Sequence, residues 1–155
     1  PCSRIMMLFG WSDSFNTRMC LAGASQALGE AGYEEKRVIK IYTARKVEMV
    51  LDALHQLKSV LKEGERPVII GYGSDIVEYI VMGIHQLYPE WIGRVDIAGF
   101  ALEGTEDKLG MDCSLVIKNP EAVGICAAEL LNQKITGEKE DREPRKYEIK
   151  VKYKF

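Results

Sequence analysis

The chain has 155 residues, of which 46% are hydrophobic and 28% are charged, and its net charge is −2. This is ordinary globular composition, and the length favours one domain with a sizeable core. The slightly negative net charge does not indicate a surface that binds nucleic acid or an acidic membrane. No apolar run has the length of a membrane span, so we expect a cytoplasmic protein with no membrane partner.

The predicted elements alternate along the chain. Short apolar runs alternate with longer stretches of helical periodicity, which is the pattern of βα units around a parallel sheet. Strands are predicted at 5–9, 38–42, 68–70, 95–98, 114–117 and 147–155. Helices are predicted from the turn at 10–14 to about residue 32, at 47–61, from the turn at 71–75 to about residue 88, and at 120–135. Residues 101–112 are expected to be a loop and 137–144 a charged linker. The sequence therefore predicts an α/β fold, a parallel-sheet three-layer sandwich.

Two turns carry local expectations. Ser12, Asp13 or Ser14 can cap the first helix, whose small residues would let it approach the sheet closely. The turn at 71–75, Gly-Tyr-Gly-Ser-Asp, lacks the third glycine of a dinucleotide loop and the lysine of a P-loop. We interpret it as a tight strand–helix turn in which Asp75 caps the helix.

Catalytic and metal-binding patterns are weak. Cys2, Cys20, Cys113 and Cys126 form no CxxC pair, which argues against zinc-ribbon and redox motifs and fits a reducing compartment. His55 and His85 lie on helical patterns far from any cluster of ligand-type residues, so we interpret them as surface or packing residues. We expect no catalytic residue, no metal and no cofactor.

Ligands of open parallel sheets bind at the carboxyl ends of the strands. Those ends are predicted at 10–16, 42–43, 71–75 and 99–103. The candidate ligand-binding residues are Asp13, Asn16, Arg18, Tyr42, Ser74, Asp75 and Phe100.

Several stretches resemble one family. The stretch RVDIAGF at 94–100 is similar to the "disvvGFDD" strand of lactose-repressor (LacI) domains. SLVIKNPEAVG at 114–124, followed by CAAELL at 126–131, resembles the crossover strand and helix of that family. Leu21-Ala-Gly23 resembles the first helix of its C-terminal lobe, and Ser74-Asp75 falls at its "aNDxmAlG" turn. The chain therefore resembles the C-terminal portion of a periplasmic-binding-protein type 1 domain.

The departures concern contacts to sugars. The two acids of "GFDD" are replaced by Ala101 and Leu102, the family's sugar-binding arginine by Cys20, and the turn asparagine by Ser74. Arg18 lies two residues before Cys20, on nearly the opposite side of a helix. These replacements argue against a simple sugar as the effector.

The resemblance implies the effector-binding part of a bacterial transcription regulator. It implies a βα lobe at 4–112, a crossover strand and helix at 113–137 and a final strand at 145–155. The ligand would be a sugar-like or other polar metabolite, with Arg18 and Asp75 as its hydrogen-bonding groups and Tyr42 as its stacking surface. DNA would be bound only through an N-terminal head absent from this chain. The alternatives are a solute-binding protein of a transporter and a small flavodoxin-like enzyme.

The resemblance also implies assembly. The helix after the third strand forms part of the dimer face in this family, and here it carries more apolar residues than one inward face requires. We expect a homodimer in which Met82 and Tyr79 are buried against the partner. The chain lacks a starting Met and begins close to a core-type strand, so we expect a longer gene product with a second lobe upstream.

Overall fold

A mixed sheet forms the centre of the computed structural model, which describes residues 4–136 and 151–154. Its strand order is β2-β1-β3-β4-β5-β6. The parallel strands are β1 (Arg4–Phe9), β2 (Val38–Tyr42), β3 (Pro67–Gly71), β4 (Asp96–Leu102) and β5 (Cys113–Lys118). β6 (Lys152–Lys154) pairs antiparallel with β5.

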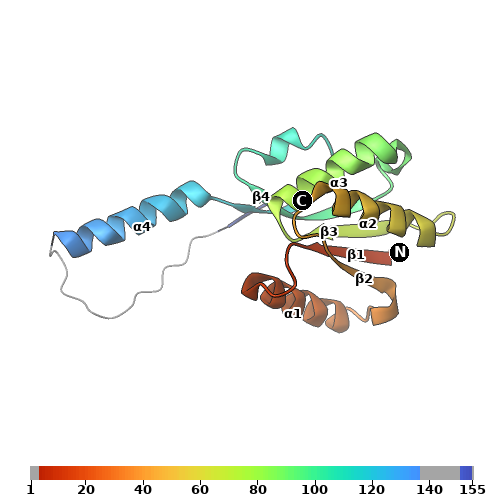
Figure 1. Ribbon diagram of the computed structural model, residues 1–155, viewed down its shortest axis with the longest axis horizontal. Coiled ribbons are helices and arrows are strands. Elements are labelled where there is room, and N and C mark those ends of the chain that lie inside the picture. The colour runs from red at the N-terminus through yellow and green to blue at the C-terminus, as the bar shows by residue number, and fades with distance from the viewer. Residues whose placement is uncertain (1–3, 137–150, 155) are drawn as a thin grey trace.

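Helices cover both faces of the sheet. α1 (Phe15–Glu30) lies on one face, whereas α2 (Val47–Val60) and α3 (Ser74–Leu87) lie on the other (Figure 1). Three short 3-10 helices, η1 (Glu35–Arg37), η2 (Pro89–Trp91) and η3 (Glu106–Lys108), lie in the connections. This arrangement confirms the predicted α/β three-layer sandwich.

The main core lies between the sheet and the α2–α3 layer. α2 turns Val50, Ala53, Leu54 and Leu57 toward the sheet at helical spacing, and all four are buried. Gly83 brings α3 against α2, since a Cβ at that position would lie 2.6 Å from Leu54 Cδ1. The helix predicted at 47–61 is therefore confirmed.

A smaller core lies under α1. Ile5, Met7 and Phe9 are buried there, and partly buried residues of α1 pack against them: Cys20, Leu21, Ala24 and Leu28. The expected close approach through small residues is wrong at Gly23, because an added Cβ there would meet nothing within 4 Å. The helix turns the face of Cys20, Ala24 and Leu28 to the sheet and leaves Gly23 exposed to solvent.

Several element bounds differ from the sequence-based prediction. β4 extends to Leu102, so residues 101 and 102 are strand rather than loop, because Ala101 is buried and pairs with Ile117 of β5. α1 ends at Glu30, and Gly32 takes a left-handed φ of 75° shortly after. β6 confirms the final strand over 152–154, whereas Val151 precedes it and is not part of a strand. The rest of that prediction at 147–150 and 155, and the linker at 137–144, lie outside the described residues.

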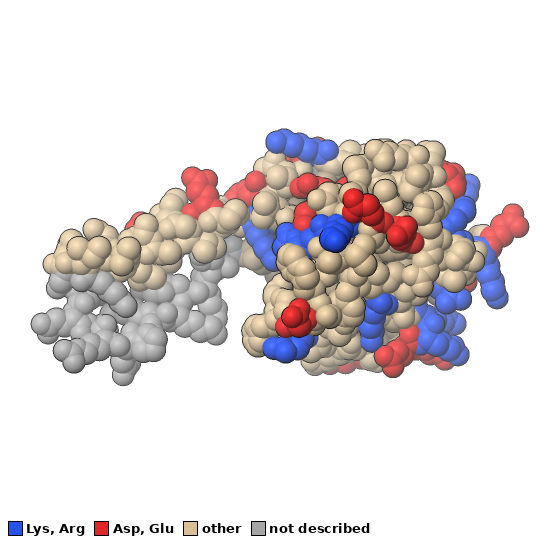
Figure 2. Space-filling model, in the orientation of Figure 1, with Lys and Arg blue, Asp and Glu red and all other residues tan. Residues whose placement is uncertain are grey.

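α4 (Pro120–Ile135) stands away from the rest of the described structure (Figure 1). Asn119 caps it, since its Oδ1 accepts a 2.7 Å hydrogen bond from the Ala122 backbone N–H. Leu131 is 60% exposed and Ile135 74% exposed. Figure 2 shows few charged side chains along this helix. Exposed apolar residues lie on more than one side of it, a pattern typical of helices that are buried in a larger protein.

Candidate functional site

The carboxyl ends of the parallel strands meet at one edge of the sheet, here called the carboxyl edge. It comprises the loops at 10–14, 43–46, 72–73 and 103–105 that follow β1, β2, β3 and β4. The chain turns in opposite directions from β1 and β3, which lie side by side, and ligands of such sheets bind in the crevice at this switch point. The carboxyl edge is therefore the candidate site.

The loop after β2 is fixed to the end of β1. Thr43 is fully buried, and its Oγ1 donates a 2.9 Å hydrogen bond to the Phe9 carbonyl oxygen. The Ala44 backbone N–H donates to the Gly10 carbonyl at 2.8 Å. Ala44 and Arg45 both have left-handed backbone conformations, with φ of 46° and 57°. A left-handed backbone conformation costs a non-glycine residue about 1–3 kcal/mol, so the surrounding hydrogen bonds must enforce this geometry.

This loop directs Arg45 across the switch point. Its Nε and Nη2 donate to the two carboxylate oxygens of Asp75 at 2.7 and 2.8 Å. The stem of Arg45 passes over Gly10, where an added Cβ would lie 3.2 Å from its Cγ. The indole of Trp11 lies over the guanidinium, 5.6 Å from ring centroid to Cζ. A charged fork is thus held between a carboxylate and an aromatic ring.

The role predicted for Asp75 as a helix cap is wrong. α3 begins at Ser74 after Gly73, and no side chain caps it. Asp75 is the second residue of α3 and not its N-cap, and its carboxylate accepts two charge-assisted hydrogen bonds from Arg45 instead. Ser14 is the N-cap residue of α1, as expected, but its side chain makes no cap bond.

A row of aromatic side chains crosses four strands near the carboxyl edge. Phe9 stacks on Tyr72 with centroids 4.5 Å apart, while Tyr42 and Phe100 flank this pair at 5.8 and 6.2 Å. Lys118 Nζ lies 3.9 Å from the centroid of the Phe100 ring. Burial, with a smaller contribution from Cys20, raises the pKa of the Tyr72 phenol to about 12. Tyr72 therefore stays neutral at physiological pH.

The sequence-predicted residues are distributed around this edge. Tyr42 and Phe100 belong to the aromatic row, and Ser74 and Asp75 open α3. Asp13 is exposed in the loop after β1, Asn16 accepts a long 3.9 Å contact from Cys20 Sγ, and Arg18 is exposed on α1. No ligand contact tests these seven roles, which stay predictions.

Three residues of the edge were missed by the sequence reasoning. Trp11, Arg45 and Lys118 each follow or end a strand. The rule that selected Tyr42 would have found Arg45 as well, had the strand end been extended beyond Thr43. The pairing of Arg45 with Asp75 had no sequence signal, because 30 residues separate them.

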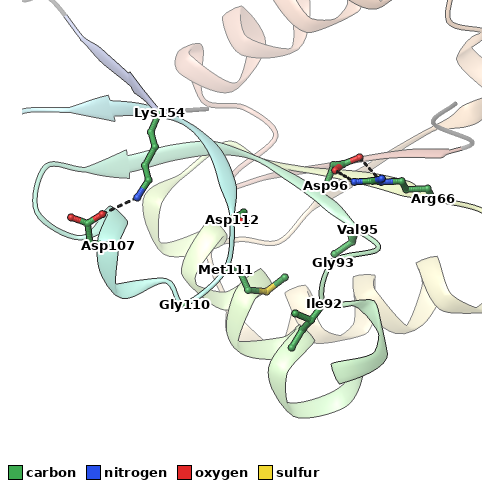
Figure 3. Close-up of a pocket in the computed structure, with 10 residues that line it drawn as sticks. All are labelled: Arg66, Ile92, Gly93, Val95, Asp96, Asp107, Gly110, Met111, Asp112 and Lys154. Carbon is green, nitrogen blue, oxygen red and sulfur yellow. Dashed lines mark hydrogen bonds and ion pairs between the residues drawn. The ribbon is translucent and has the colours of Figure 1, made fainter.

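A second hollow lies at the opposite, amino edge of the sheet (Figure 3). This amino-edge pocket has a volume of about 580 Å³. Two ion pairs line it: Arg66 holds both oxygens of Asp96 at 2.7 and 3.0 Å, and Lys154 lies 2.8 Å from Asp107. It lies away from the switch point.

The described part of the chain contains no group of three or more His, Cys, Asp or Glu side chains that could hold a metal ion. Within residues 4–136 and 151–154, no helix is both long and apolar enough to cross a membrane.

Comparison with known proteins identifies the fold. No protein-family model matches the chain. No curated protein matches it either. A probable transcription regulator from Thermus thermophilus is 21% identical with a TM-score of 0.75, over 99% of this chain and 58% of that one. A candidate LacI-family repressor from Corynebacterium glutamicum is 18% identical with a TM-score of 0.70, over 88% and 51%.

A solute-binding protein of an ABC transporter from Burkholderia graminis, in complex with D-arabinose, also matches. It is 13% identical with a TM-score of 0.75, over 98% of this chain and 52% of that one. This chain thus spans between half and three fifths of the length of these three structures. They share the periplasmic-binding-protein type 1 fold with it.

Proposed function

We propose that this chain is the ligand-sensing portion of a bacterial transcription regulator of the LacI type. One observation carries the proposal: β5 leaves the sheet at the carboxyl edge and leads directly into α4, an apolar helix that stands off the body. A chain that crosses at this point would place a second lobe opposite the loops of the carboxyl edge. A small molecule would then bind between the two lobes.

The division of the chain follows from this arrangement. We infer that residues 4–112 and β6 form one lobe and that β5 and α4 cross to the other. α4 packs into that second lobe, which residues outside this sequence supply. The exposed Val123, Ile125, Leu131 and Ile135 support this assignment, because large apolar side chains left in water promote association.

The sensing mechanism is a change in the angle between the lobes. The effector is a small polar metabolite held by Asp13, Asn16, Arg18, Tyr42, Ser74, Asp75 and Phe100. Arg18 and Asp75 hydrogen-bond it, and Tyr42 stacks on it. Closure around the effector shifts a dimer between two arrangements of DNA-binding heads, which lie outside this sequence. The protein is cytoplasmic, a proposal supported only by the neighbours that are transcription regulators. It has no catalytic activity of its own, which neighbours that are regulators and solute-binding proteins support.

A homodimer is formed through α3. Most of its apolar residues, including Ile76, Ile80 and Ile84, are buried within this chain, while Tyr79 and Met82 are half-buried. Met82 lines a hollow of about 370 Å³ between α3 and the loop around Leu109. We expect Met82→Glu to shift the natural protein from dimer to monomer in sedimentation velocity; a wild-type monomer would contradict this assembly.

A solute-binding protein of a transporter is the second candidate, favoured by the match to the D-arabinose complex. Deletion of the gene separates the two functions. A regulator predicts altered transcript levels of a few operons, restored by the wild-type gene and not by Trp11→Ala. Loss of uptake of a labelled solute with no change in transcripts would select the transporter component.

A further inference from the structure

We propose that the ligand of the carboxyl edge is an organic anion whose carboxylate or phosphate binds the guanidinium of Arg45. This inference rests on the proposed function, since it names the class of ligand that the same site takes. The neutral sugar seen in the D-arabinose complex belongs to that protein. The charge and geometry of this edge favour a different ligand.

Arg45 has hydrogen-bonding capacity left for a ligand. An arginine side chain carries five N–H donors, and the contacts to Asp75 use one on Nε and one on Nη2. The side chain is 46% exposed, so the remaining donors face an accessible space. The planar fork of a guanidinium matches the oxygens of carboxylates and phosphates.

The guanidinium is positioned before any ligand arrives. Its backbone is held in the left-handed region by the hydrogen bonds of Thr43 and Ala44 to the end of β1. Asp75 fixes the fork from one side and Trp11 covers it. A preorganised donor loses little conformational freedom on binding, which raises affinity for a matching anion.

The helix N-termini around Arg45 also favour a negatively charged ligand. α1, α2 and α3 all begin at the carboxyl edge, and their N-cap residues Ser14, Lys46 and Gly73 make no side-chain cap bond. By contrast, Asn119 does cap α4. Uncapped first-turn N–H groups attract negative groups, and Arg45 directly precedes the N-cap of α2.

The uncharged part of the ligand has a surface to pack on. Trp11 is 52% exposed although it lies beside the guanidinium. A neutral polyol should bind less well here. Both Asp75 oxygens already accept hydrogen bonds from Arg45, so fewer acceptor positions remain for sugar hydroxyls. The edge therefore suits a molecule with one anionic group and an adjoining apolar or ring portion.

A matched pair at the amino edge provides a control. Arg66 and Asp96 form the same bidentate contact at 2.7 and 3.0 Å, also 30 residues apart. They lie far from the three helix N-termini, at the starts of β3 and β4. Arg66→Gln removes an equivalent ion pair without touching the proposed anion site.

The test is a fluorescence titration of Trp11 in the natural gene product. Glucose 6-phosphate is compared with glucose, benzoate with benzyl alcohol, and inorganic phosphate is added alone. Trp91 is buried on the amino side, and Trp11→Phe identifies the signal. We expect an organic anion to bind at least ten-fold more tightly than its neutral counterpart and more tightly than inorganic phosphate. The pair that responds tells phosphate from carboxylate.

Variants complete the test. Arg45→Gln should weaken anion binding at least ten-fold, Arg45→Lys should retain part of it, and Arg66→Gln should leave it unchanged, with circular dichroism confirming that each is folded. Neutral compounds that bind as well as anions would overturn the anionic class, and anion binding that survives Arg45→Gln would overturn the role of Arg45. Either result would leave the ligand site itself intact. Absence of any response would overturn the anionic class, and equilibrium dialysis against a cell extract then decides separately whether a ligand site exists.

Discussion

Gly99→Ala is the sharpest test of how the fold builds the carboxyl edge. Gly99 of β4 pairs with Gly71 of β3 under the first turn of α3. A Cβ at Gly99 would lie 2.4 Å from the Gly71 carbonyl oxygen and 2.6 Å from Val77 Cγ2. Favourable non-bonded carbon contacts lie at about 3.5–4.0 Å, so the overlap is about 1 Å. Because one obstacle is backbone, side-chain rotation cannot relieve it.

Overpacking of this kind costs about 1–3 kcal/mol, and we expect the upper half of that range. For a chain of this size, about 2–3 kcal/mol lowers Tm by about 5–10 °C. Thermal unfolding followed by circular dichroism measures the change. Gly23→Ala is the matched control, since nothing lies within 4 Å of its added Cβ, and it should stabilise the helix by about 0.5–1 kcal/mol. A Gly99→Ala protein that melts with the wild type would refute the close contact of α3 with the sheet.

Three further predictions concern titration and packing. Burial raises the pKa of Tyr72 to about 12, whereas an unfolded tyrosine titrates near pH 10. Between these pH values the folded state binds more protons than the unfolded state, so the free energy of unfolding should fall as the pH rises from 10 to 12. Denaturant titrations should show a smaller fall for Tyr72→Phe. Burial raises the pKa of the Cys113 thiol to about 11, so a thiol reagent at pH 8 should label it more slowly than Cys20; equal rates would contradict its burial. Leu131→Glu should change the unfolding free energy of the 155-residue chain by less than about 0.5 kcal/mol, because Leu131 is exposed in it. In a gene product with a second lobe the same change should cost about 2–5 kcal/mol. Equal effects in the two proteins would refute packing of α4 against a second lobe.

The layers of the fold could be predicted because their signals are local. Apolar runs at 5–9 and 38–42 became β1 and β2 almost residue for residue. The periodicity after residue 47 gave α2, and Pro89 marked the end of α3. Each depends on side-chain spacing within a few residues, which hydrophobic burial then enforces.

The carboxyl edge was predictable in position but less so in detail. Topology placed Tyr42 and Phe100 at the same edge of the sheet, and the structure puts them at opposite ends of the aromatic row. The Arg45–Asp75 pair depends on a left-handed turn at two non-glycine residues, Ala44 and Arg45, whose own backbone preferences do not predict that conformation. The extension of β4 through Leu102 depends on pairing with β5, a tertiary contact that overrides the polar character of the following loop.

Equilibrium dialysis of the natural gene product against an extract of its own cells tests the central claim most directly, because it requires no guess about the ligand. Mass spectrometry would compare the metabolites retained by the wild type with those retained by Trp11→Ala at the carboxyl edge. Ile92→Ala is the control, an exposed apolar residue that lines the amino-edge pocket. We predict that a small polar metabolite is enriched by the wild type and by Ile92→Ala, and is lost with Trp11→Ala. Equal retention by all three proteins, or no enrichment by the wild type, would contradict a ligand site at the carboxyl edge.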